Sequence, residues 1–259
     1  MPELPEVEIM RRNVDAWGAG RHLVRFVPKD PKWQDLVVPP GPIRGTFRRG
    51  KALVWNIGDH SLLLHFRMTG KIVQWHEERR YTRACFELSD GMTLAFVDQR
   101  RFADLLVMSP VELQRYLEGK KWGPEPWPDP LPPEWWVNRF GNLKMAVKPA
   151  LMRADCVVGI GNILASEICH AAGVHPERRC STLTSEDWLR LSGCVVPLID
   201  RVIDTESGPE IAYVNQGGGG SMFSVYGRSR KGCLRCGVGV VQQIRQSGRS
   251  TYLCPNCQK

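Results

Sequence analysis

The sequence predicts an α+β protein of two domains, with a β-rich N-terminal domain and a helical C-terminal domain that ends in a small metal module. Three observations lead to this prediction: short apolar runs between residues 22 and 108, a proline-rich stretch from 123 to 133, and helical periodicity followed by paired cysteines beyond it. We place the N-terminal domain at residues 1–120, a linker at 121–136, the helical domain at 137–227 and the cysteine module at 228–259.

The N-terminal domain is expected to begin with a helix and to continue as an antiparallel sandwich or barrel. Apolar residues first recur at helical spacing, at Val7, Met10, Val14 and Trp17, and Pro5 suits the first turn. Short runs bounded by Gly, Asp or Arg then predict strands. These runs are His22–Val27, Ala52–Ile57, Ser61–Phe66, Ala84–Leu88, Met92–Val97 and Asp104–Val107.

Six prolines between residues 123 and 133 exclude a helix or a central strand there and indicate an extended linker. Beyond it, helices are predicted over Asn142–Met152, Ile163–Ala172 and Ser185–Asp204. Pro149 is expected to break or kink the first, Gly173 to cap the second, and Thr184 with Asp187 to form a capping box for the third. The glycine run 217–220 predicts a flexible loop.

Composition excludes several classes of protein. The 259 residues are 42% hydrophobic and 24% charged, which is ordinary globular composition rather than that of a disordered chain. The sequence contains no apolar stretch long enough to span a membrane, and its start does not resemble a secretory signal, so we expect a cytoplasmic protein. The net charge of +8 fits a polyanionic partner but does not by itself identify one.

The nine cysteines fall into two groups. Five lie scattered in mostly apolar surroundings and are expected to be buried: Cys85, Cys156, Cys169, Cys180 and Cys194. The other four form two C-x2-C pairs separated by 17 residues: Cys233, Cys236, Cys254 and Cys257. This spacing predicts one structural zinc ion, with four unrelated thiols as the alternative, because four thiolates leave no open position for water. The surrounding arginines suit phosphate contacts or, individually, a merely solvated surface.

The N-terminus offers a chemically unusual group. Removal of Met1 would expose Pro2 as a secondary α-amine, which has a usable neutral fraction at physiological pH. Such an amine can attack a sugar C1′ or an aldehyde to form an iminium, and Glu3 could transfer the proton. Taken alone, however, a Met-Pro start is more often without function.

Several motifs, in order along essentially the whole chain, resemble those of bacterial formamidopyrimidine-DNA glycosylases. They are Met-Pro-Glu-Leu-Pro-Glu-Val-Glu at 1–8, Arg49-Gly50-Lys51, Leu64-His65-Phe66-Arg67-Met68-Thr69-Gly70, Asp98-Gln99-Arg100-Arg101-Phe102, a helix-two-turn-helix segment at 158–178, Val225-Tyr226-Gly227-Arg228, and the four cysteines with Gly248-Arg249 between them. The resemblance implies an N-terminal antiparallel β-sandwich with a flanking helix, and a C-terminal helix-two-turn-helix domain with a zinc-finger hairpin.

The resemblance also implies roles for particular residues. Pro2 is then the nucleophile on the sugar C1′, Glu3 protonates the opening deoxyribose, Glu6 supports the site and Lys51 contacts phosphate near the lesion. The implied DNA-binding residues are His65, Met68, Arg100, Arg101, Phe102, Lys148, Asn162, Tyr226 and Arg249. Among these, Met68, Arg100 and Phe102 fill the gap left by an extruded base.

We therefore predict a bifunctional DNA glycosylase and abasic-site lyase that removes oxidised purines from double-stranded DNA, acts as a monomer and binds no membrane. Two alternatives remain: an endonuclease VIII-like enzyme for oxidised pyrimidines, against which Leu4 argues, and a non-catalytic zinc-ribbon protein that binds damaged DNA. The chain departs from the family pattern at Arg67, where glycine is usual, and at Gln99 and Ala103.

Overall fold

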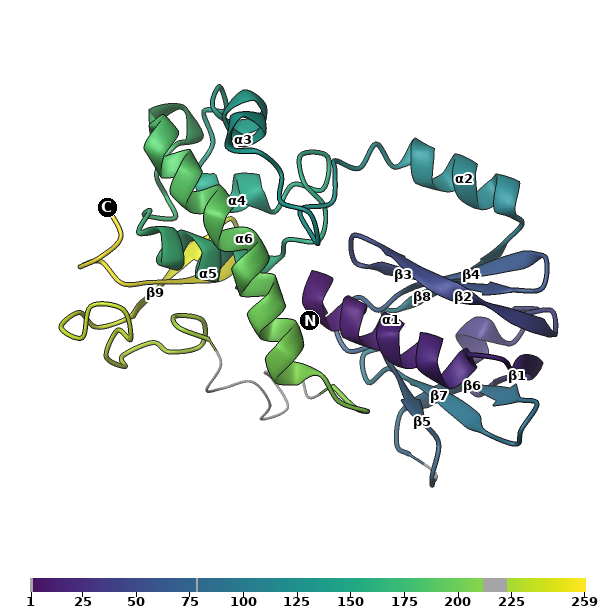
Figure 1. Cartoon of the computed structure of the whole chain (residues 1–259). Helices are drawn as coiled ribbons and strands as arrows, with labels where there is room; N and C mark the ends of the chain where they lie inside the picture. Colours follow the sequence, from purple (N-terminus) through teal and green to yellow (C-terminus); the bar gives the residue numbers. More distant parts are fainter. Residues whose placement is uncertain (1, 78, 212–222) are drawn as a thin grey trace. The chain divides into compact units, whose positions relative to one another are not determined.

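The computed structural model describes residues 2–77, 79–211 and 223–259, which form two compact units (Figure 1). Within the described residues, the first unit comprises 2–121 together with 206–211, and the second comprises 122–205 and 223–259. No helix in these ranges combines the length and the apolar character needed to cross a membrane.

The first unit is an antiparallel β-sandwich flanked by helix α1 (Leu4–Gly18). One layer has the strand order β5-β7-β6-β1 and the other β2-β3-β4-β8, and β1 and β2 join them through only two residue pairs. The strands are β1 (His22–Pro28), β2 (Gly41–Arg49), β3 (Ala52–Ile57), β4 (His60–His65), β5 (Lys71–Gln74), β6 (Thr82–Leu88), β7 (Thr93–Val97) and β8 (Asp104–Met108). A short 3-10 turn at Pro31–Trp33 follows β1.

Helix α1 forms because its apolar side chains recur on one face and Pro5 lies in its first turn, where no backbone donor is lost. Leu4, Val7 and Val14 are fully buried, and the helix packs against β2 and β3. The predicted strands are all present, with ends shifted by at most two residues, whereas β2, β5 and the following helix α2 (Pro110–Gly119) were not predicted.

The second unit contains α3 (Pro133–Phe140), α4 (Val147–Leu151), α5 (Asn162–Ala172), a 3-10 turn (Cys180–Thr182), α6 (Ser185–Glu206, whose last residue clusters with the first unit) and a hairpin of β9 (Gln242–Gln246) and β10 (Arg249–Leu253). The predicted caps are present. Gly173 ends α5 at a φ of 72°, and Thr184 and Asp187 exchange hydrogen bonds of 3.0 and 3.2 Å before α6.

Two expectations about this part of the chain were wrong, and one falls outside the described residues. The helix predicted over Asn142–Met152 is only the five-residue α4, since the backbone at Ala146 is extended. Pro149 lies within its first turn, where the missing N–H breaks no hydrogen bond. For the same reason Pro133, expected to belong to the linker, begins α3. The glycine run 217–220 lies outside the described residues.

Candidate active site and nucleic-acid interface

An open pocket of about 500 Å³ in the first unit brings together several of the residues singled out by sequence. It is lined by Pro2, Lys51, His65, Arg67, Met68, Phe102 and Asp104. These residues come from the chain start, the β2–β3 turn, the end of β4, the loops that follow β4 and β7, and the start of β8. Pro2, Lys51 and Met68 therefore share one cavity, although some 66 positions separate the first from the last.

A buried aspartate holds the two loops together. Asp98 is fully buried and accepts backbone N–H bonds from Ala103 at 2.9 Å and Arg100 at 3.2 Å, as well as a short hydrogen bond from the Thr69 hydroxyl. The Arg100 N–H also donates to the Thr69 hydroxyl at 3.1 Å. Because one carboxylate serves both loops, it ties together the loops that carry Met68 and Phe102, both of which line the pocket.

The start of α1 carries two buried carboxyl groups next to Pro2. The Glu3 N–H donates to Glu6 Oε2 at 2.8 Å, and the Glu3 carboxylate accepts the Glu6 backbone N–H, which completes a capping box. Burial, followed by the charge of Glu3, raises the pKa of Glu6 to about 7. Burial also raises the pKa of Glu206, at the end of α6, to about 7. Glu6 can therefore hold or release a proton near neutral pH.

The raised pKa of Glu6 predicts a pH-dependent loss of stability. The native state keeps this proton up to about pH 7, whereas the unfolded chain releases it near the ordinary glutamate pKa of 4.5. The free energy of unfolding therefore falls as the pH rises through this interval. Glu6→Gln removes the ionisation, so we expect it to raise Tm by about 3 °C at pH 8 and by less at pH 5.

Thermal unfolding at the two pH values measures this difference. Glu87→Gln is the control, because its change in Tm at pH 8 is expected to have the opposite sign. The hydrogen bond from Arg25 lowers the pKa of Glu87, so this carboxylate stabilises the fold above its unfolded pKa. Its loss should lower Tm slightly at pH 8. A gain for Glu6→Gln that is equal at both pH values would contradict the assigned titration.

His65 is neutral at physiological pH. Burial, then the charges of Arg67 and Lys51, lowers the pKa of His65 to about 4. Its Nδ1 accepts the backbone N–H of Arg67 at 3.3 Å, which leaves the ring proton on Nε2 as a donor. Lys51 follows Gly50, whose φ of 58° allows the tight β2–β3 turn. The positive charges of this pocket therefore come from Lys51 and Arg67.

The three residues of the Arg-Arg-Phe motif have different surroundings. Phe102 is 49% exposed, and the Arg100 guanidinium lies 4.7 Å from the centre of its ring. An exposed aromatic ring under a cation suits stacking on a base. Arg101 instead donates to the buried carboxylate of Asp30 at 2.8 Å, so in this structure it holds its loop.

Three of the predicted DNA-binding residues in the second unit converge at the start of α5. The buried Lys148 donates to Asn162 Oδ1 at 2.6 Å. The Asn162 side-chain amide donates to the Ser250 carbonyl at 3.0 Å and lies 3.5 Å from the Tyr226 hydroxyl. Asn162 thus links a helix N-terminus, which favours anions, to the zinc hairpin.

Arg249 is exposed at the first position of β10, directly after the hairpin turn at Ser247 and Gly248. Its neighbour Ser250 supplies the carbonyl that Asn162 binds. Arg249 therefore adjoins the Asn162 cluster through the chain, with its guanidinium available to a phosphate.

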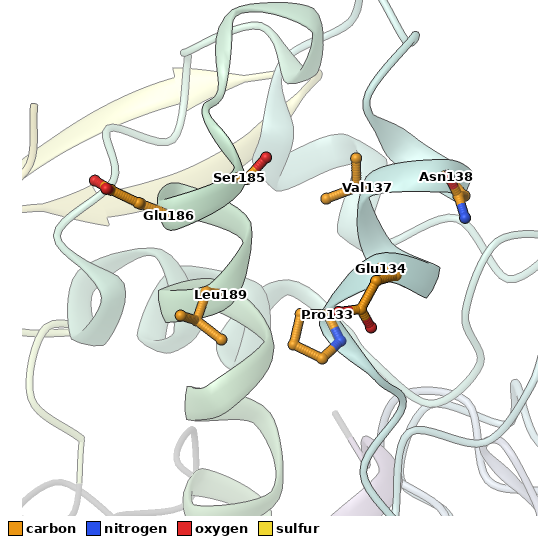
Figure 2. A pocket seen from close by; sticks show the side chains of 7 residues that line it. All are labelled: Pro133, Glu134, Val137, Asn138, Ser185, Glu186 and Leu189. Atoms are coloured by element: carbon orange, nitrogen blue, oxygen red, sulfur yellow. The ribbon is translucent and has the colours of Figure 1, made fainter.

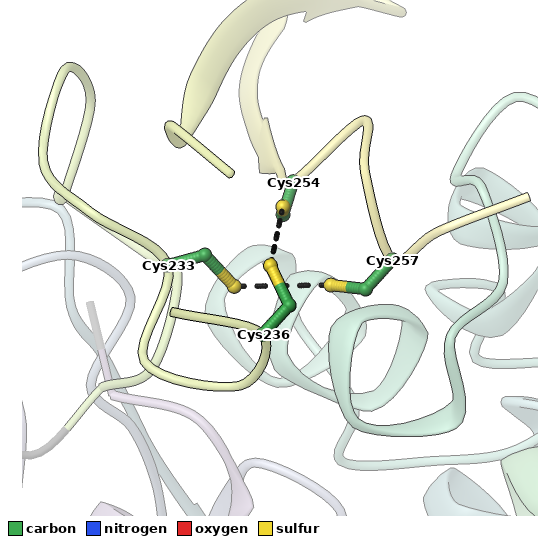
Figure 3. A group of neighbouring side chains, drawn as sticks. All are labelled: Cys233, Cys236, Cys254 and Cys257. Carbon is green, nitrogen blue, oxygen red and sulfur yellow. Dashed lines mark hydrogen bonds between the residues drawn. The ribbon is translucent and has the colours of Figure 1, made fainter. Parts of the chain in front are cut away.

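The four paired cysteines form a site for one zinc ion. Their sulfur atoms lie within 4.8 Å of one another, and the Cys233–Cys257 and Cys236–Cys254 sulfur pairs are each 3.8 Å apart (Figure 3). A regular tetrahedron with zinc–sulfur bonds of about 2.3 Å has sulfur–sulfur edges of about 3.8 Å. The donor set therefore fits zinc and leaves no open position, which confirms the predicted structural site.

Neighbouring groups support the thiolates. The N–H groups of Arg235 and Gly239 donate to Cys233 and Cys236 at 3.4 and 3.3 Å. His170 Nε2 lies 3.3 Å from the Cys233 sulfur, and burial, followed by the charge of Arg235, lowers the pKa of His170 to about 4. A neutral imidazole that donates to a thiolate orients a ligand without competing for the metal.

A second pocket, of about 570 Å³, lies in the second unit between α3 and the N-terminal part of α6 (Figure 2). It is lined by Pro133, Glu134, Val137, Asn138, Ser185, Glu186 and Leu189. These lining residues include two carboxylates and no cation, so the pocket does not suit a phosphate backbone.

Two further residues were not among the site residues selected from sequence. Glu167 is 1% exposed and accepts the backbone N–H groups of Ser224, Val225 and Tyr226 at 2.8–2.9 Å, which holds Tyr226 beside Asn162. An acid in the apolar run of α5 was the available signal for it. Asp98 was noted only as part of a motif, because its role depends on a loop 29 residues away.

Comparison with known proteins covers nearly all of the chain. The family models that match are the formamidopyrimidine-DNA glycosylase N-terminal domain (residues 1–105), the formamidopyrimidine-DNA glycosylase H2TH domain (122–211) and a zinc finger found in FPG and IleRS (231–259). A formamidopyrimidine-DNA glycosylase from Streptococcus pyogenes is 33% identical over 273 residues, covering 100% of this chain and 99% of the relative.

Solved structures agree with this similarity. Lactococcus lactis Fpg in complex with DNA that contains an abasic site matches with a TM-score of 0.88 and 26% identity over 99% of each chain. A variant of the same protein with DNA that contains Fapy-dG matches with a TM-score of 0.88 and 27% identity over 100% of each chain.

Proposed function

The chain belongs to the formamidopyrimidine-DNA glycosylase family, and on that premise we propose that Pro2 is its catalytic nucleophile, acting on a damaged nucleotide held in the pocket of the first unit. The protein is a DNA glycosylase of base excision repair with abasic-site lyase activity. The observation that carries the residue assignment is the shared pocket, in which Pro2 lies with Lys51, Met68 and Phe102.

The chemistry follows from these residues. Once Met1 is removed, the neutral Pro2 amine forms a bond to the sugar C1′ while the bond from C1′ to the damaged base breaks, and the base leaves with the proton that the Pro2 nitrogen gives up. Glu3 takes up a proton from water and passes it to O4′ as the C1′–O4′ bond opens, which leaves an iminium between Pro2 and C1′. Because Glu6 titrates near neutral pH, it can accept a proton from this region.

The iminium also accounts for strand cleavage. It acidifies the C2′ proton, and loss of this proton expels the 3′ phosphate in a β-elimination. A second, δ-elimination expels the 5′ phosphate, and hydrolysis of the iminium returns the free amine. Water is the only co-reactant in this sequence.

Access to C1′ requires the nucleotide to leave the base stack. Met68, Arg100 and Phe102 fill the vacated space in this proposal, which is supported by the carboxylate of Asp98 that the loops carrying them share. In the second unit, Asn162, Tyr226 and Arg249 contact the phosphate backbone, the buried Lys148 orients Asn162, and the zinc hairpin keeps the Ser250 carbonyl in place for Asn162. The substrate is double-stranded DNA with damaged bases or abasic sites, and the enzyme acts in the bacterial cytoplasm.

The substrate class that we propose is oxidised purine opposite cytosine, with ring-opened formamidopyrimidine preferred over 8-oxoguanine. The relatives named for formamidopyrimidine and the complex with Fapy-dG support this class, although the same Lactococcus lactis protein is also solved with DNA that contains an oxidised pyrimidine. They also disfavour a non-catalytic zinc-ribbon protein. An opened imidazole ring weakens stacking, which lowers the free energy needed for extrusion.

Arg100 is expected to read the base opposite the lesion. A guanidinium can donate two hydrogen bonds to O2 and N3 of an orphaned cytosine. Arg100→Ala should therefore reduce the ratio of kcat/KM for lesions opposite cytosine to that opposite adenine by about tenfold. The measurement is a panel of duplexes, each with one lesion opposite each normal base.

The control is Arg230→Ala, which removes an exposed arginine of the second unit. It should leave the ratio of kcat/KM opposite cytosine to that opposite adenine unchanged. Faster cleavage of thymine glycol than of either purine lesion would contradict the substrate class. An unchanged ratio in Arg100→Ala would contradict the role of Arg100.

A further inference from the structure

Arg67 has a backbone conformation that its residue type disfavours. Its φ is 55°, in the left-handed region where glycine is favoured because other side chains crowd the backbone. Its side chain is 51% exposed, so burial in the core does not compensate for the strain. Of the six described residues other than glycine that have a positive φ, Arg67 alone lines the pocket that holds Pro2, which points to a functional use of its side chain.

The Arg67 side chain is held towards the nucleophile's pocket by one carboxylate. Arg67 Nε and Nη2 donate to Asp104 Oδ2 at 2.8 and 2.6 Å. Asp104 also lies 3.4 Å from Lys32 Nζ, and the hydrogen bonds and charges of Arg67 and Lys32 outweigh its burial and keep its pKa low. The ion pair forms because β4 and β8 pair in a register that sets His65 opposite Asp104.

This pair contributes little to stability. Ion pairs that are half exposed have small net effects because solvent screens them and ordering the side chains costs entropy. Asp104 keeps Lys32 as a second cation, so Arg67 can turn part of its guanidinium to another anion without leaving Asp104 unpaired. Among the described residues, Nη1 of Arg67 has no hydrogen-bond partner, so one edge of the guanidinium remains available to bind an anion.

The charges of the pocket favour an anion. Among its lining side chains, the cations Lys51 and Arg67 outnumber the one carboxylate, that of Asp104, while His65 is neutral. The anion that DNA offers next to a sugar C1′ is a backbone phosphate, and a planar guanidinium binds phosphate oxygens well.

We propose that Arg67 is a substrate-binding residue that contacts a backbone phosphate at the damaged nucleotide together with Lys51, with Asp104 as the positioning carboxylate. The proposal rests on the pocket being the site of DNA glycosylase chemistry.

The test is the salt dependence of binding to a duplex with a reduced abasic-site analogue. Arg67→Ala should weaken binding about three- to tenfold at low salt and should reduce the slope of log K against log salt by about 0.9, as expected for one lost phosphate contact. The matched control is Arg25→Ala. Arg25 donates to Glu87 through Nε and Nη2 in the same way, is 66% exposed, and lies in the same unit but outside the pocket. It should leave the slope unchanged.

Two further variants separate binding from folding. Arg67→Gly relieves the strain, so its Tm should stay within about 2 °C of the wild type while its slope falls as in Arg67→Ala. Arg67→Lys keeps the charge and should keep most of the slope. An unchanged slope in Arg67→Ala overturns the proposal, as does a loss of affinity that depends only on the opposite base. Borohydride trapping of the wild type on abasic DNA tests the enzyme chemistry separately, since it does not depend on Arg67.

Discussion

Pro2→Gly is expected to lower the rate of strand cleavage at a preformed abasic site by about 10³-fold or more, because the secondary amine that forms the iminium is lost. Glycine keeps a primary α-amine, so slow residual elimination is consistent with the mechanism. Borohydride should fix the wild-type protein to abasic DNA, and peptide mapping should place the adduct on residue 2. Single-turnover cleavage assays measure the rate.

Lys51→Ala is the informative comparison, since Lys51 lines the same pocket and is also an amine. It should bind DNA more weakly but still form the adduct at residue 2. Glu3→Gln should impair base removal more than cleavage of an abasic site, where the base is already gone. An adduct that maps to Lys51, or no adduct at all, would remove Pro2 from its assigned role.

Disruption of the zinc site is expected to abolish DNA binding. Cys254 is fully buried, and its loss leaves three thiolates in a module whose folding depends on the metal. Cys254→Ser should therefore lose stoichiometric zinc and weaken binding to abasic-site DNA by ~100-fold or more. Metal analysis and binding titrations measure the two effects. Full affinity in zinc-free protein would contradict this prediction.

A glycine pair in the same module provides a sharper test. A Cβ added at Gly239 would lie 2.5 Å from the Cys254 sulfur and 3.2 Å from the Cys236 sulfur, so Gly239→Ala must displace ligands. We expect its zinc affinity to fall by about 10–100-fold. A Cβ at Gly232 meets no atom within 4 Å, so Gly232→Ala should bind zinc normally. Equal affinities for the two variants would show that the ligand geometry is not limiting.

Local sequence accounts for the elements whose signals lie within a few residues of one another. The capping box at Thr184 and Asp187 marks the start of α6, and Gly173 marks the end of α5, because caps satisfy backbone groups of the adjoining turn. The zinc site follows in the same way from knuckle spacing. The start of α2 carries a signal of the same kind, since Ser109 and Glu112 form a capping box there.

Other elements could not be predicted, because their local sequence is not typical of the structure that they adopt. Gly41, Pro42 and Gly45 suggest a loop, yet they lie in β2, which pairs with β1 over only two residue pairs and has a bulge between Ile43 and Gly45. Bulges tolerate such residues because the ladder is already interrupted there. Strand β5 has only four residues, too few for a clear alternation.

The candidate site shows the same division. The identities of Pro2, Glu3 and the cysteines could be proposed from sequence, since their chemistry depends on residue type, chain position or short spacing. That Pro2 shares a pocket with Arg67 and Phe102 could not, because it depends on Asp98 joining two distant loops and on the register of β4 with β8. The pKa of Glu6 likewise follows from burial against the sandwich, which no local pattern encodes. Short-range spacing thus determined the elements and the chemical groups, whereas long-range pairing decided which groups meet and how strongly they titrate.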